Sequence, residues 1–421
     1  MSPATIIRHA TELPRLLVAA LLALSQMSAA VEHDTLVPIR DSLNVVLKPC
    51  GRSRQSRIFY QKLDSVLLFE TGRVNVVHLG GSHVQADIYT NVIRRHLDSL
   101  NGTLRPPRGL IFPFETAGTN NPANYRAWHT GRWQGARNAK RQFERPLGVA
   151  GIMASTADTT ASVSISLNAD STRRWQATTL TVLGSSLHGG VRPRIVLGDT
   201  LTLRPDSTRL GFVFELGRPV DSFRMTLCFD SPDRPDTFCL RGFVPDNQEP
   251  GLVYHSIGVN GASVPSYLGC EYFERELALL RPDLFVMAVG INDATGPNFT
   301  DSLLCADYDS LIARIRRVAP DCALMFVSNN DSFHRVRRRR VVNPNGQVAR
   351  RAFERLACKW QSGFWDLFEV MGGLGSVQRW RDLGLARPDR VHFTRAGYEL
   401  VGRLFVEAFL NDYFDYDYEE Q

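Results

Sequence analysis

Val74–Asp87 reads Val-Asn-Val-Val-His-Leu-Gly-Gly-Ser-His-Val-Gln-Ala-Asp, and it joins a short apolar run to a helical pattern. The run Val74–Leu79 has the composition of a parallel strand that is buried on both faces. Gly80 and Gly81 permit a tight turn, and Ser82 follows directly. A serine there lies at the positive end of a helix dipole, where backbone N–H groups can stabilise an oxyanion. Ser82 is therefore a candidate nucleophile, although an ordinary strand-to-helix turn with a serine cap has the same pattern.

Helical patterns flank this strand on both sides. The segment after Ser82 predicts one helix that ends near Asn101-Gly102. Its apolar residues recur at roughly helical spacing: Val84, Ile88, Val92 and Leu97. Within residues 31–73 a second helix is expected, with one apolar face: Phe59, Leu63, Val66 and Leu67.

After Pro250 the chain alternates between predicted strands and helices. The expected strands are Leu252–Ile257, Leu284–Val289, Ala323–Val327 and Phe364–Phe368. The expected helices are Ser266–Leu280, Ser302–Val318, Gln347–Lys359 and Arg395–Phe409. This alternation predicts an α/β fold, a doubly wound parallel sheet with helices on both faces, in which ligands bind at the carboxyl ends of the strands.

Between the two α/β segments the pattern is that of antiparallel strands. Residues 148–245 contain alternating runs with almost no helical pattern, which predict a β-sandwich or jelly roll: Val163–Leu167, Thr179–Leu183, Arg194–Leu197, Gly211–Leu216 and Phe223–Phe229. We therefore expect an inserted β-rich domain at 106–250. It divides one α/β domain into 31–105 and 251–411, and an acidic surface tail follows at 412–421.

Residues 1–30 have the pattern of a secretory signal peptide, with Arg8 and Arg15, an apolar run at Leu16–Leu24 and a small-residue site at Ser28–Ala30. The sequence predicts an exported protein, periplasmic or extracellular, with no stable membrane span after cleavage. Cleavage lowers the formal charge from +6 to +5. So small a charge gives no reason to expect a nucleic-acid partner.

Seven cysteines are expected to enter an oxidising compartment. Cys228 and Cys239 flank a Pro- and Asp-rich turn, and they could form a disulfide across a hairpin. The run Arg337–Arg340 would suggest nucleic-acid binding in a cytosolic protein, but export removes that interpretation. We expect a solvated loop or helix entrance there, with contact to an anionic polymer as the alternative.

Polar residues gather where the predicted strands end. Gly258–Ser263 follows the strand from Leu252, and Gly290-Ile-Asn292-Asp293 follows the strand from Leu284. Near the carboxyl end of the chain stands Asp389-Arg-Val-His392. Each fragment alone is a weak signal, but their order and their positions at strand ends are specific.

With these four blocks the sequence resembles the SGNH hydrolases, also called the GDSL-like esterase and lipase superfamily. Gly80-Gly81-Ser82 matches the nucleophile block, Gly261 the second block, Gly290–Asp293 the third and Asp389–His392 the fourth. The resemblance implies a three-layer, flavodoxin-like α/β fold. The pair Ser82-His83 and the β-rich insertion are similar to the branch that contains peptidoglycan and polysaccharide O-acetylesterases.

The resemblance also implies the roles of the site residues. Ser82, His392 and Asp389 would form a catalytic triad, with Asp389 holding the imidazole tautomer. The oxyanion hole would consist of the backbone N–H groups of Ser82 and Gly261 and the side-chain amide of Asn292. One residue departs from the family, because Gly81 stands where the first block usually has aspartate.

Further polar residues are candidates for substrate binding: His83, Asn120, Asn121 and Asn330. Packing for His83, and turn or loop roles for the others, are the alternatives. No CxxC pair or HExxH helix is present, so a zinc site has no local support. The expected chemistry implies no metal or organic cofactor.

The sequence predicts an exported serine esterase that removes small acyl groups, acetyl in particular, from an envelope or extracellular polysaccharide or peptidoglycan. An O-acyltransferase with the same triad and a non-catalytic glycan-binding protein on a degenerate scaffold are the alternatives.

Overall fold

The structure is a computed structural model, and it describes residues 39–140, 146–169, 175–198, 201–203, 205–208, 211–231, 236–296 and 298–416. The predicted signal peptide lies outside these residues. So do the last five residues of the predicted tail.

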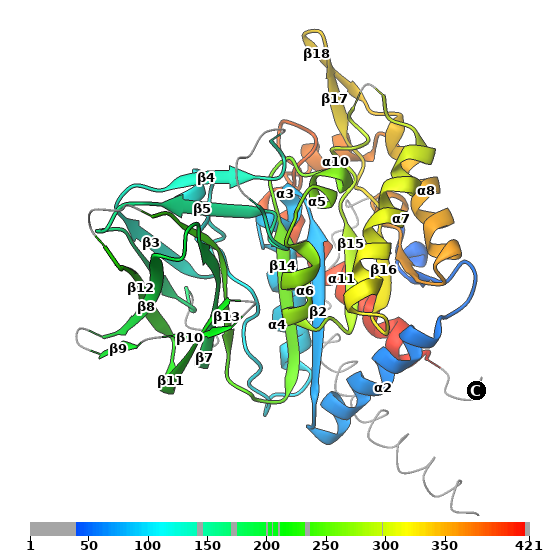
Figure 1. The fold of residues 1–421 in the computed structure, drawn as a ribbon. Helices are drawn as coiled ribbons and strands as arrows, with labels where there is room; N and C mark the ends of the chain where they lie inside the picture. Colours follow the sequence, from blue (N-terminus) through cyan, green and yellow to red (C-terminus); the bar gives the residue numbers. More distant parts are fainter. Residues whose placement is uncertain are drawn as a thin grey trace, which may run out of the picture.

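A six-stranded sheet forms the centre of the α/β part (Figure 1). Its strands, in spatial order, are β1 (Val46–Leu47), β19 (Gly363–Trp365), β16 (Ala323–Val327), β15 (Leu284–Ala288), β2 (Arg73–Gly80) and β14 (Gly251–Gly258). All neighbours are parallel except β1, which pairs antiparallel with β19 at the edge. The five parallel strands, numbered along the chain, have the order 2-1-3-4-5, which is flavodoxin-like. The predicted doubly wound sheet is thus confirmed.

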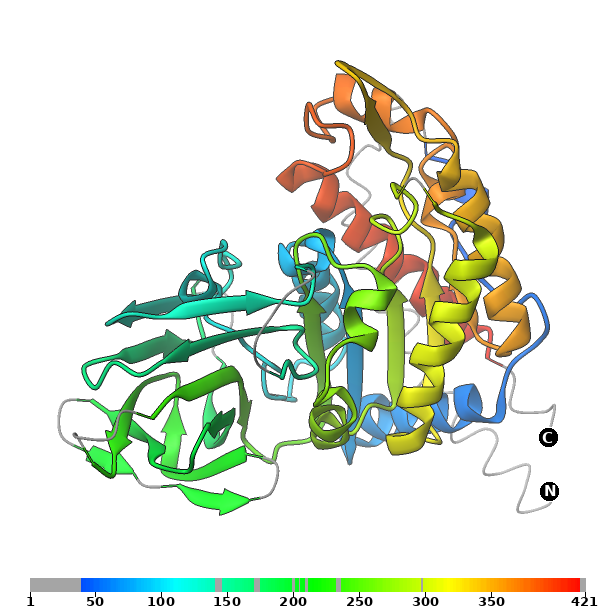
Figure 2. The same cartoon turned by 45° about the horizontal axis from the view of Figure 1, so that its top comes forward.

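Helices cover both faces of this sheet, as Figure 2 shows. One face packs against α2 (Arg54–Phe69), α4 (Tyr89–Ser99), α9 (Leu367–Val370), α10 (Ser376–Asp382) and α11 (Arg395–Phe414). The other packs against α5 (Val264–Leu268), α6 (Phe273–Leu280), α7 (Asp301–Val318) and α8 (Asn345–Lys359). Alternate residues of a strand enter the two cores, as Val76 and Val77 of β2 do.

Two helices that the sequence predicts as continuous are interrupted. The helix after Ser82 divides into α3 (Ser82–Gln85) and α4, because Asp87 has a left-handed backbone with φ of 46°. The buried Asp87 carboxylate accepts hydrogen bonds from Arg94 and Arg108, so tertiary contacts fix the break. The predicted helix Ser266–Leu280 likewise divides into α5 and α6, and the backbone N–H of Tyr272 between them donates to Leu147 in the insertion.

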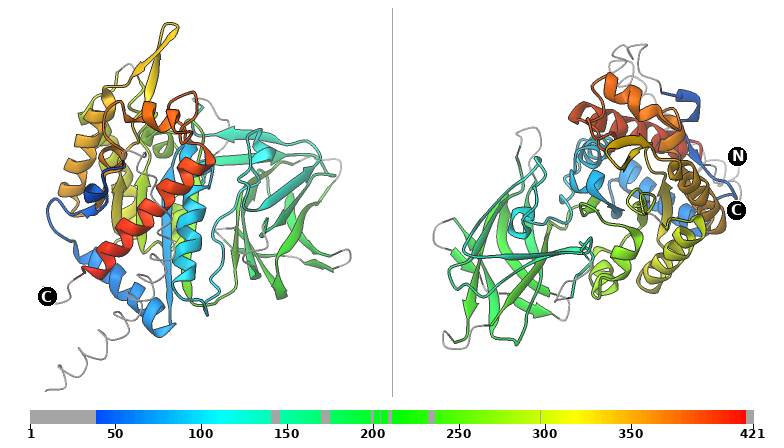
Figure 3. Two further views of the ribbon diagram at one scale, coloured as in Figure 1. Left: turned by 180° about the vertical axis from the view of Figure 1, so that it is seen from behind. Right: turned by 90° about the horizontal axis from the view of Figure 1, so that it is seen from above.

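The β-rich insertion is a sandwich of two antiparallel sheets, seen beside the α/β part in Figure 3. The first sheet has the order β10 (Asp206–Thr208), β11 (Gly211–Val220), β7 (Ala177–Ser186), β13 (Phe238–Asp246), β5 (Ile152–Thr156) and β4 (Gln134–Arg137). The second has the order β3 (Arg126–Thr130), β6 (Ser162–Ser166), β12 (Ser222–Phe229), β8 (Val191–Leu197) and β9 (Leu201–Leu203). Alternating apolar residues such as Val163 and Leu180 fill one core between the sheets.

Short elements complete the description of the chain. Two 3-10 helices are η1 (Asp41–Leu43) and η2 (Phe114–Ala117), and a separate hairpin consists of β17 (Phe333–Val336) and β18 (Arg339–Val342). Among the described residues, no helix has the length and apolar character that a membrane crossing requires.

The proposed Cys228–Cys239 disulfide is wrong. These residues lie on β12 and β13, which belong to different sheets of the sandwich, and neither forms a disulfide. The disulfide bond instead joins Cys50 to Cys358, whose Cα atoms are 4.7 Å apart although 308 positions separate them in sequence.

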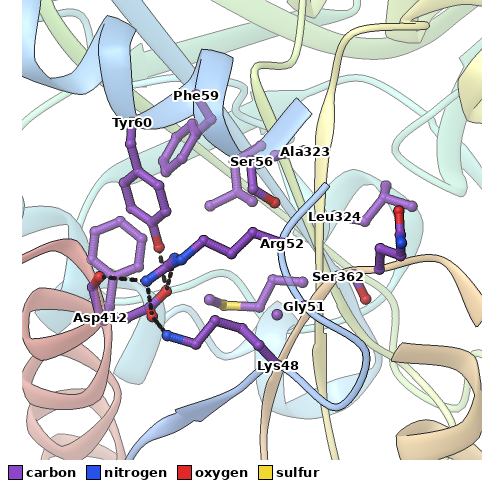
Figure 4. Close-up of a pocket in the computed structure, with 15 residues that line it drawn as sticks. Lys48, Gly51, Arg52, Ser56, Phe59, Tyr60, Ala323, Leu324, Ser362 and Asp412 are labelled. Carbon is purple, nitrogen blue, oxygen red and sulfur yellow. Dashed lines mark hydrogen bonds and ion pairs between the residues drawn. The ribbon is translucent and has the colours of Figure 1, made fainter. Parts of the chain in front are cut away.

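The expected surface tail starts too early at Asp412. Helix α11 continues to Phe414, and the Asp412 side chain is buried. Figure 4 shows that Lys48, Arg52 and Tyr60 converge on its carboxylate. Arg52 Nη2 lies 3.0 Å from Asp412 Oδ1, and Lys48 and the Tyr60 hydroxyl also bond the carboxylate. The acidic residue therefore fastens the carboxyl-terminal helix to α2 and the loop before it.

The substitution Asp412→Ala should lower the free energy of unfolding by roughly 3 kcal/mol, because it leaves two basic groups without their buried partner. Urea denaturation measures the change. Asp415→Ala is the matched control, since Asp415 lies three residues later and is exposed. Equal stability of the two variants would show that the cluster does not hold the helix.

Candidate active site

The turn after β2 places Ser82 at the carboxyl edge of the sheet. A Cβ atom at Gly80 would lie 2.2 Å from Val84 Cγ2, so only glycine fits there. The hydroxyl of the buried Tyr267 donates to the Gly80 carbonyl oxygen at 2.8 Å and holds the turn from the α5 side. Ser82 follows as the first residue of α3.

Ser82, His392 and Asp389 meet at this edge. Ser82 Oγ lies 2.8 Å from His392 Nε2, and His392 Nδ1 lies 2.9 Å from Asp389 Oδ2. A carboxylate only accepts, so Nδ1 carries the proton in this contact and Nε2 is left as a base toward the serine hydroxyl. The arrangement can take a proton from Ser82 and return it to a leaving group.

Asp389 is held as an ionised acceptor. Its Oδ1 accepts the backbone N–H groups of Val391 and His392, both at 2.9 Å. Partial burial alone would raise the pKa of Asp389, but the hydrogen bonds from the His392 backbone and ring outweigh it and lower that pKa below its ordinary value. The carboxylate therefore stays charged at neutral pH and can stabilise the imidazolium that forms during proton transfer.

The loop that carries Asp389 and His392 is anchored from the segment after β16 and from the start of β17. Asn330 donates from Nδ2 to the Val391 carbonyl oxygen at 2.9 Å, and the backbone N–H of Phe333 donates to the Arg390 carbonyl oxygen at 2.9 Å. Asn330 is only 4% exposed. Both contacts of Asn330 Nδ2 go to backbone carbonyl oxygens, those of Asp331 and Val391, so the geometry favours a positioning role for Asn330 over the expected substrate contact.

Asn292 and Gly261 come together beside the serine turn. Asn292 Nδ2 donates to the Ala262 carbonyl oxygen at 2.8 Å, which fixes the amide and leaves its second N–H for another acceptor. Gly261 has φ of 85°, a left-handed conformation that favours glycine. A Cβ at Gly81 would lie 3.4 Å from Asn292 Nδ2. The aspartate that the family usually has at that position would thus sit against Asn292, and in this chain a backbone carbonyl orients the amide.

Asp293 supports the same loop. Its carboxylate accepts the backbone N–H of Val264, the first residue of α5, at 3.1 Å. Burial raises the pKa of Asp293 to about 6, against the opposing effect of the Val264 hydrogen bond. This agrees with the structural role expected for the residue.

His83 packs against the triad and does not present its ring as a second base. Its Nδ1 lies 2.9 Å from the Tyr398 hydroxyl, and its ring centroid is 5.2 Å from that of His392. Burial, aided by His392, lowers the pKa of His83 to about 3, so the ring is neutral at physiological pH. The packing interpretation of His83 therefore fits this geometry better than substrate contact.

Gln85 is a site residue that sequence analysis missed. Its amide nitrogen donates to Thr119 Oγ1 at 3.1 Å and to the Asn120 carbonyl oxygen at 3.3 Å, while its Oε1 accepts the backbone N–H of Asn260 at 2.7 Å. One buried side chain thus joins the serine helix, the loop of the insertion and the loop that carries Gly261. The only available signal was its position three residues after Ser82 on the predicted helix.

The two neighbouring asparagines of that loop differ in what they can offer a substrate. Asn121 Oδ1 accepts the Phe114 backbone N–H at 2.7 Å, so this side chain anchors its own loop. Asn120 Oδ1 lies 3.3 Å from Asn260 Nδ2 at an exposed position and remains a candidate for contact with substrate.

Replacing Asp293 by asparagine should change how stability depends on pH. The folded protein holds the Asp293 proton more tightly than the unfolded chain does, so stability falls as pH rises from about 4 through about 6. Asp293→Asn keeps an oxygen for Val264 and removes this loss. The variant should match the parent near pH 4 and gain on the order of 1–3 kcal/mol at pH 7.5.

Urea denaturation across this pH range measures the difference. Asp415→Asn, at an exposed position, controls for the removal of one negative charge. A difference between Asp293→Asn and the parent that does not change with pH would contradict the assignment.

Comparison with known proteins was made for both sequence and structure. The model of the GDSL-like lipase/acylhydrolase family matches residues 232–400. This range covers less than half of the chain and includes Asn292, Asp389 and His392, while Ser82 lies before the insertion. No curated protein matches the chain.

Among solved structures, a peptidoglycan O-acetylesterase superposes with a TM-score of 0.72 at 19% identity, over 87% of this chain and 99% of that one. A lipase/acylhydrolase from Enterococcus faecalis covers 39% of this chain and 77% of its own at 18% identity, with a TM-score of 0.30. An acetyl xylan esterase covers 38% and 81% at 16% identity, also with a TM-score of 0.30.

The first of these structures shows the same fold along nearly its whole length, insertion included. The family match adds the blocks that carry Asn292, Asp389 and His392. Both agree with the resemblance seen in the sequence. Residues 232–400 therefore match the GDSL-like lipase/acylhydrolase family, and the chain shares the fold of the peptidoglycan O-acetylesterase.

Proposed function

We propose that this protein is an exported serine esterase that removes small acyl groups, acetyl in particular, from a cell-envelope or extracellular polysaccharide. The observation that carries the proposal is the hydrogen-bonded series from Ser82 through His392 to Asp389, with the Asn292 amide beside the serine turn.

In the first step Ser82 Oγ attacks the ester carbonyl carbon while His392 Nε2 takes the hydroxyl proton. The oxyanion that forms accepts hydrogen bonds from the backbone N–H groups of Ser82 and Gly261 and from Asn292 Nδ2. The bond between the carbonyl carbon and the sugar oxygen then breaks, and His392 gives its proton to that oxygen. The products are the free sugar hydroxyl and an acyl group on Ser82.

In the second step a water molecule attacks the acyl carbon and gives a proton to His392. The bond to Ser82 Oγ breaks, His392 returns the proton to the serine, and the carboxylic acid leaves. Asp389 keeps the imidazole oriented in both steps and is not itself protonated.

The polysaccharide substrate is supported by the solved structure that shares this fold, since its name describes an enzyme acting on O-acetylated peptidoglycan. The superposition extends through the β-sandwich as well as the α/β part. We therefore assign to the sandwich a part in holding the glycan.

Export is supported by two independent features. The sequence has the pattern of a signal peptide at residues 1–30. The Cys50–Cys358 disulfide is of a kind that persists in oxidising compartments.

The substitution Ser82→Ala should abolish hydrolysis of an aryl acetate and of an acetylated polysaccharide, with a loss of at least about 10⁴-fold in kcat. Acetate release measures the rate. A fluorophosphonate should label the parent protein at Ser82 in a one-to-one ratio and leave the variant unlabelled.

Three results separate the alternatives to this function. Equal activity of the parent and Ser82→Ala would reject the mechanism. Glycan binding without labelling would favour a non-catalytic protein. Acyl transfer to an added acceptor glycan that outpaces hydrolysis would favour a transferase.

The substitution Asn292→Ala should lower kcat by about 10²- to 10³-fold with little change in KM, because the lost donor acts mainly on the developing oxyanion. Asn101→Ala is the matched control, since Asn101 lies in an exposed turn and bonds Glu70 near the start of β2. An Asn292→Ala enzyme with the kcat of the control would exclude this amide from the oxyanion hole.

A further inference from the structure

A basic hairpin projects from the α/β part beside the loop that carries Asp389 and His392, which we call the triad loop. It consists of β17, β18 and the two-residue turn between them, and we call it the arginine hairpin (Phe333–Val342). It extends away from the body of the protein in Figure 1. Every residue from Arg335 to Val341 is exposed, and five of them are arginines: Arg335, Arg337, Arg338, Arg339 and Arg340.

The hairpin concentrates positive charge at a cost to its own stability. Arg335 lies directly opposite Arg340 in the strand register, and like charges in that position repel. Arg337 has φ of 53° at the turn, where glycine or asparagine is less strained. No carboxylate among the described residues forms an ion pair with any of the five. Folding alone therefore gives no reason for this cluster.

The base of the hairpin touches the loop that carries the triad. Arg340 Nη1 donates to the Asp389 carbonyl oxygen at 2.6 Å, and the guanidinium of Arg390 lies 5.1 Å from the centre of the Phe333 ring. Asp389 is in turn hydrogen-bonded to His392, which contacts Ser82. Three contacts thus lead from the hairpin to the candidate nucleophile.

We propose that the arginine hairpin binds acidic groups of the polymer whose ester reaches Ser82, so that the substrate is an anionic polysaccharide. The inference rests on the proposed function and adds the substrate class to it. Carboxylate and phosphate groups on sugars are the ligands that a guanidinium binds with two parallel N–H donors. A polymer with such groups along its chain reaches both the hairpin and the serine.

The position of the hairpin favours a polysaccharide over a lipid surface. Val336 and Val341 are exposed on one face and could meet a membrane, but Arg335 and Arg340 lie on the other face of the strand pair. That second face is the one that contacts the triad loop through Arg340. Arg335 and Arg340 therefore face the approach to the site that a glycan chain must occupy, whereas Arg339 shares the face of Val336 and Val341, and Arg337 and Arg338 form the turn.

The first experiment measures binding without catalysis. Ser82→Ala protein is titrated with acetylated pectin as the acidic polymer and with acetylated glucomannan as the neutral one. The same protein with Arg335→Gln, Arg338→Gln and Arg339→Gln forms the hairpin variant. Arg340 is kept because it bonds the triad loop, and Arg337 because of its backbone conformation.

A matched control removes three exposed arginines on α2, α8 and α11, outside the hairpin: Arg54→Gln, Arg351→Gln and Arg403→Gln. The parent should prefer pectin, and that preference should weaken as salt rises. The hairpin variant should lose about tenfold in affinity for pectin and little for glucomannan, while the control keeps the preference.

The second experiment measures acetate release by the parent, the hairpin variant and the control, each with the native Ser82. The ratio of kcat/KM on pectin to kcat/KM on glucomannan should fall about tenfold in the hairpin variant, through KM, and should be unchanged in the control. A ratio is independent of the fraction of folded protein, so loss of folding cannot imitate the result.

The outcomes separate this inference from the proposed function. Equal ratios and affinities for the hairpin variant and the control overturn the inference, even if both proteins are active esterases. Hairpin-dependent binding to vesicles containing anionic lipid, with unchanged binding to pectin, also overturns it. Hairpin-dependent binding to pectin with no release of acetate from any polymer supports the anionic glycan site and rejects the esterase.

Discussion

The hydrogen bond between Ser82 Oγ and His392 Nε2 joins residues that are 310 positions apart, and this contact depends on the parallel sheet. A parallel sheet brings the carboxyl ends of all its strands to one edge, so groups from distant parts of the chain meet there without any long excursion of the backbone. Ser82 follows β2, and Gly261 and Asn292 lie in the loops after β14 and β15. The imidazole of His392 comes from the segment before α11.

Each of these groups is in turn fixed by a neighbour that does no chemistry. The Asp389 carboxylate is held by backbone N–H groups of its own loop, and that loop is held by Asn330. The Asn292 amide is turned by the Ala262 carbonyl, which explains how the site is ordered although Gly81 has no carboxylate to offer. Rigid placement of donors before the substrate arrives is what makes them effective in the transition state.

The sequence predicted the sheet and the four blocks because their signals are local. Short apolar runs define the strands, and the glycine, asparagine and aspartate residues at their ends stand next to those runs. The alternating runs of the insertion gave the sandwich for the same reason. Such features can be recognised in one sequence without knowing which segments contact each other.

The features that the sequence did not predict depend on contacts between residues that are distant in the chain. The break at Asp87 depends on Arg94 and Arg108, and the burial of Asp412 depends on Lys48 and Arg52 far along the chain. An acidic residue near the end of a sequence looks solvated until its partners are known. The pairing of Cys50 with Cys358 is likewise a property of the folded arrangement, since many pairings of seven cysteines are compatible with the sequence.

That disulfide has a consequence wherever the folded protein meets a protease. It links two positions between which lie Ser82, the whole sandwich and most of the exposed loops. A single cleavage in any of those loops after Ser82 leaves two pieces that are still covalently joined, one bearing the serine and the other the histidine. Because the disulfide keeps the two pieces linked, they cannot gain the entropy of separating, and they remain one molecule.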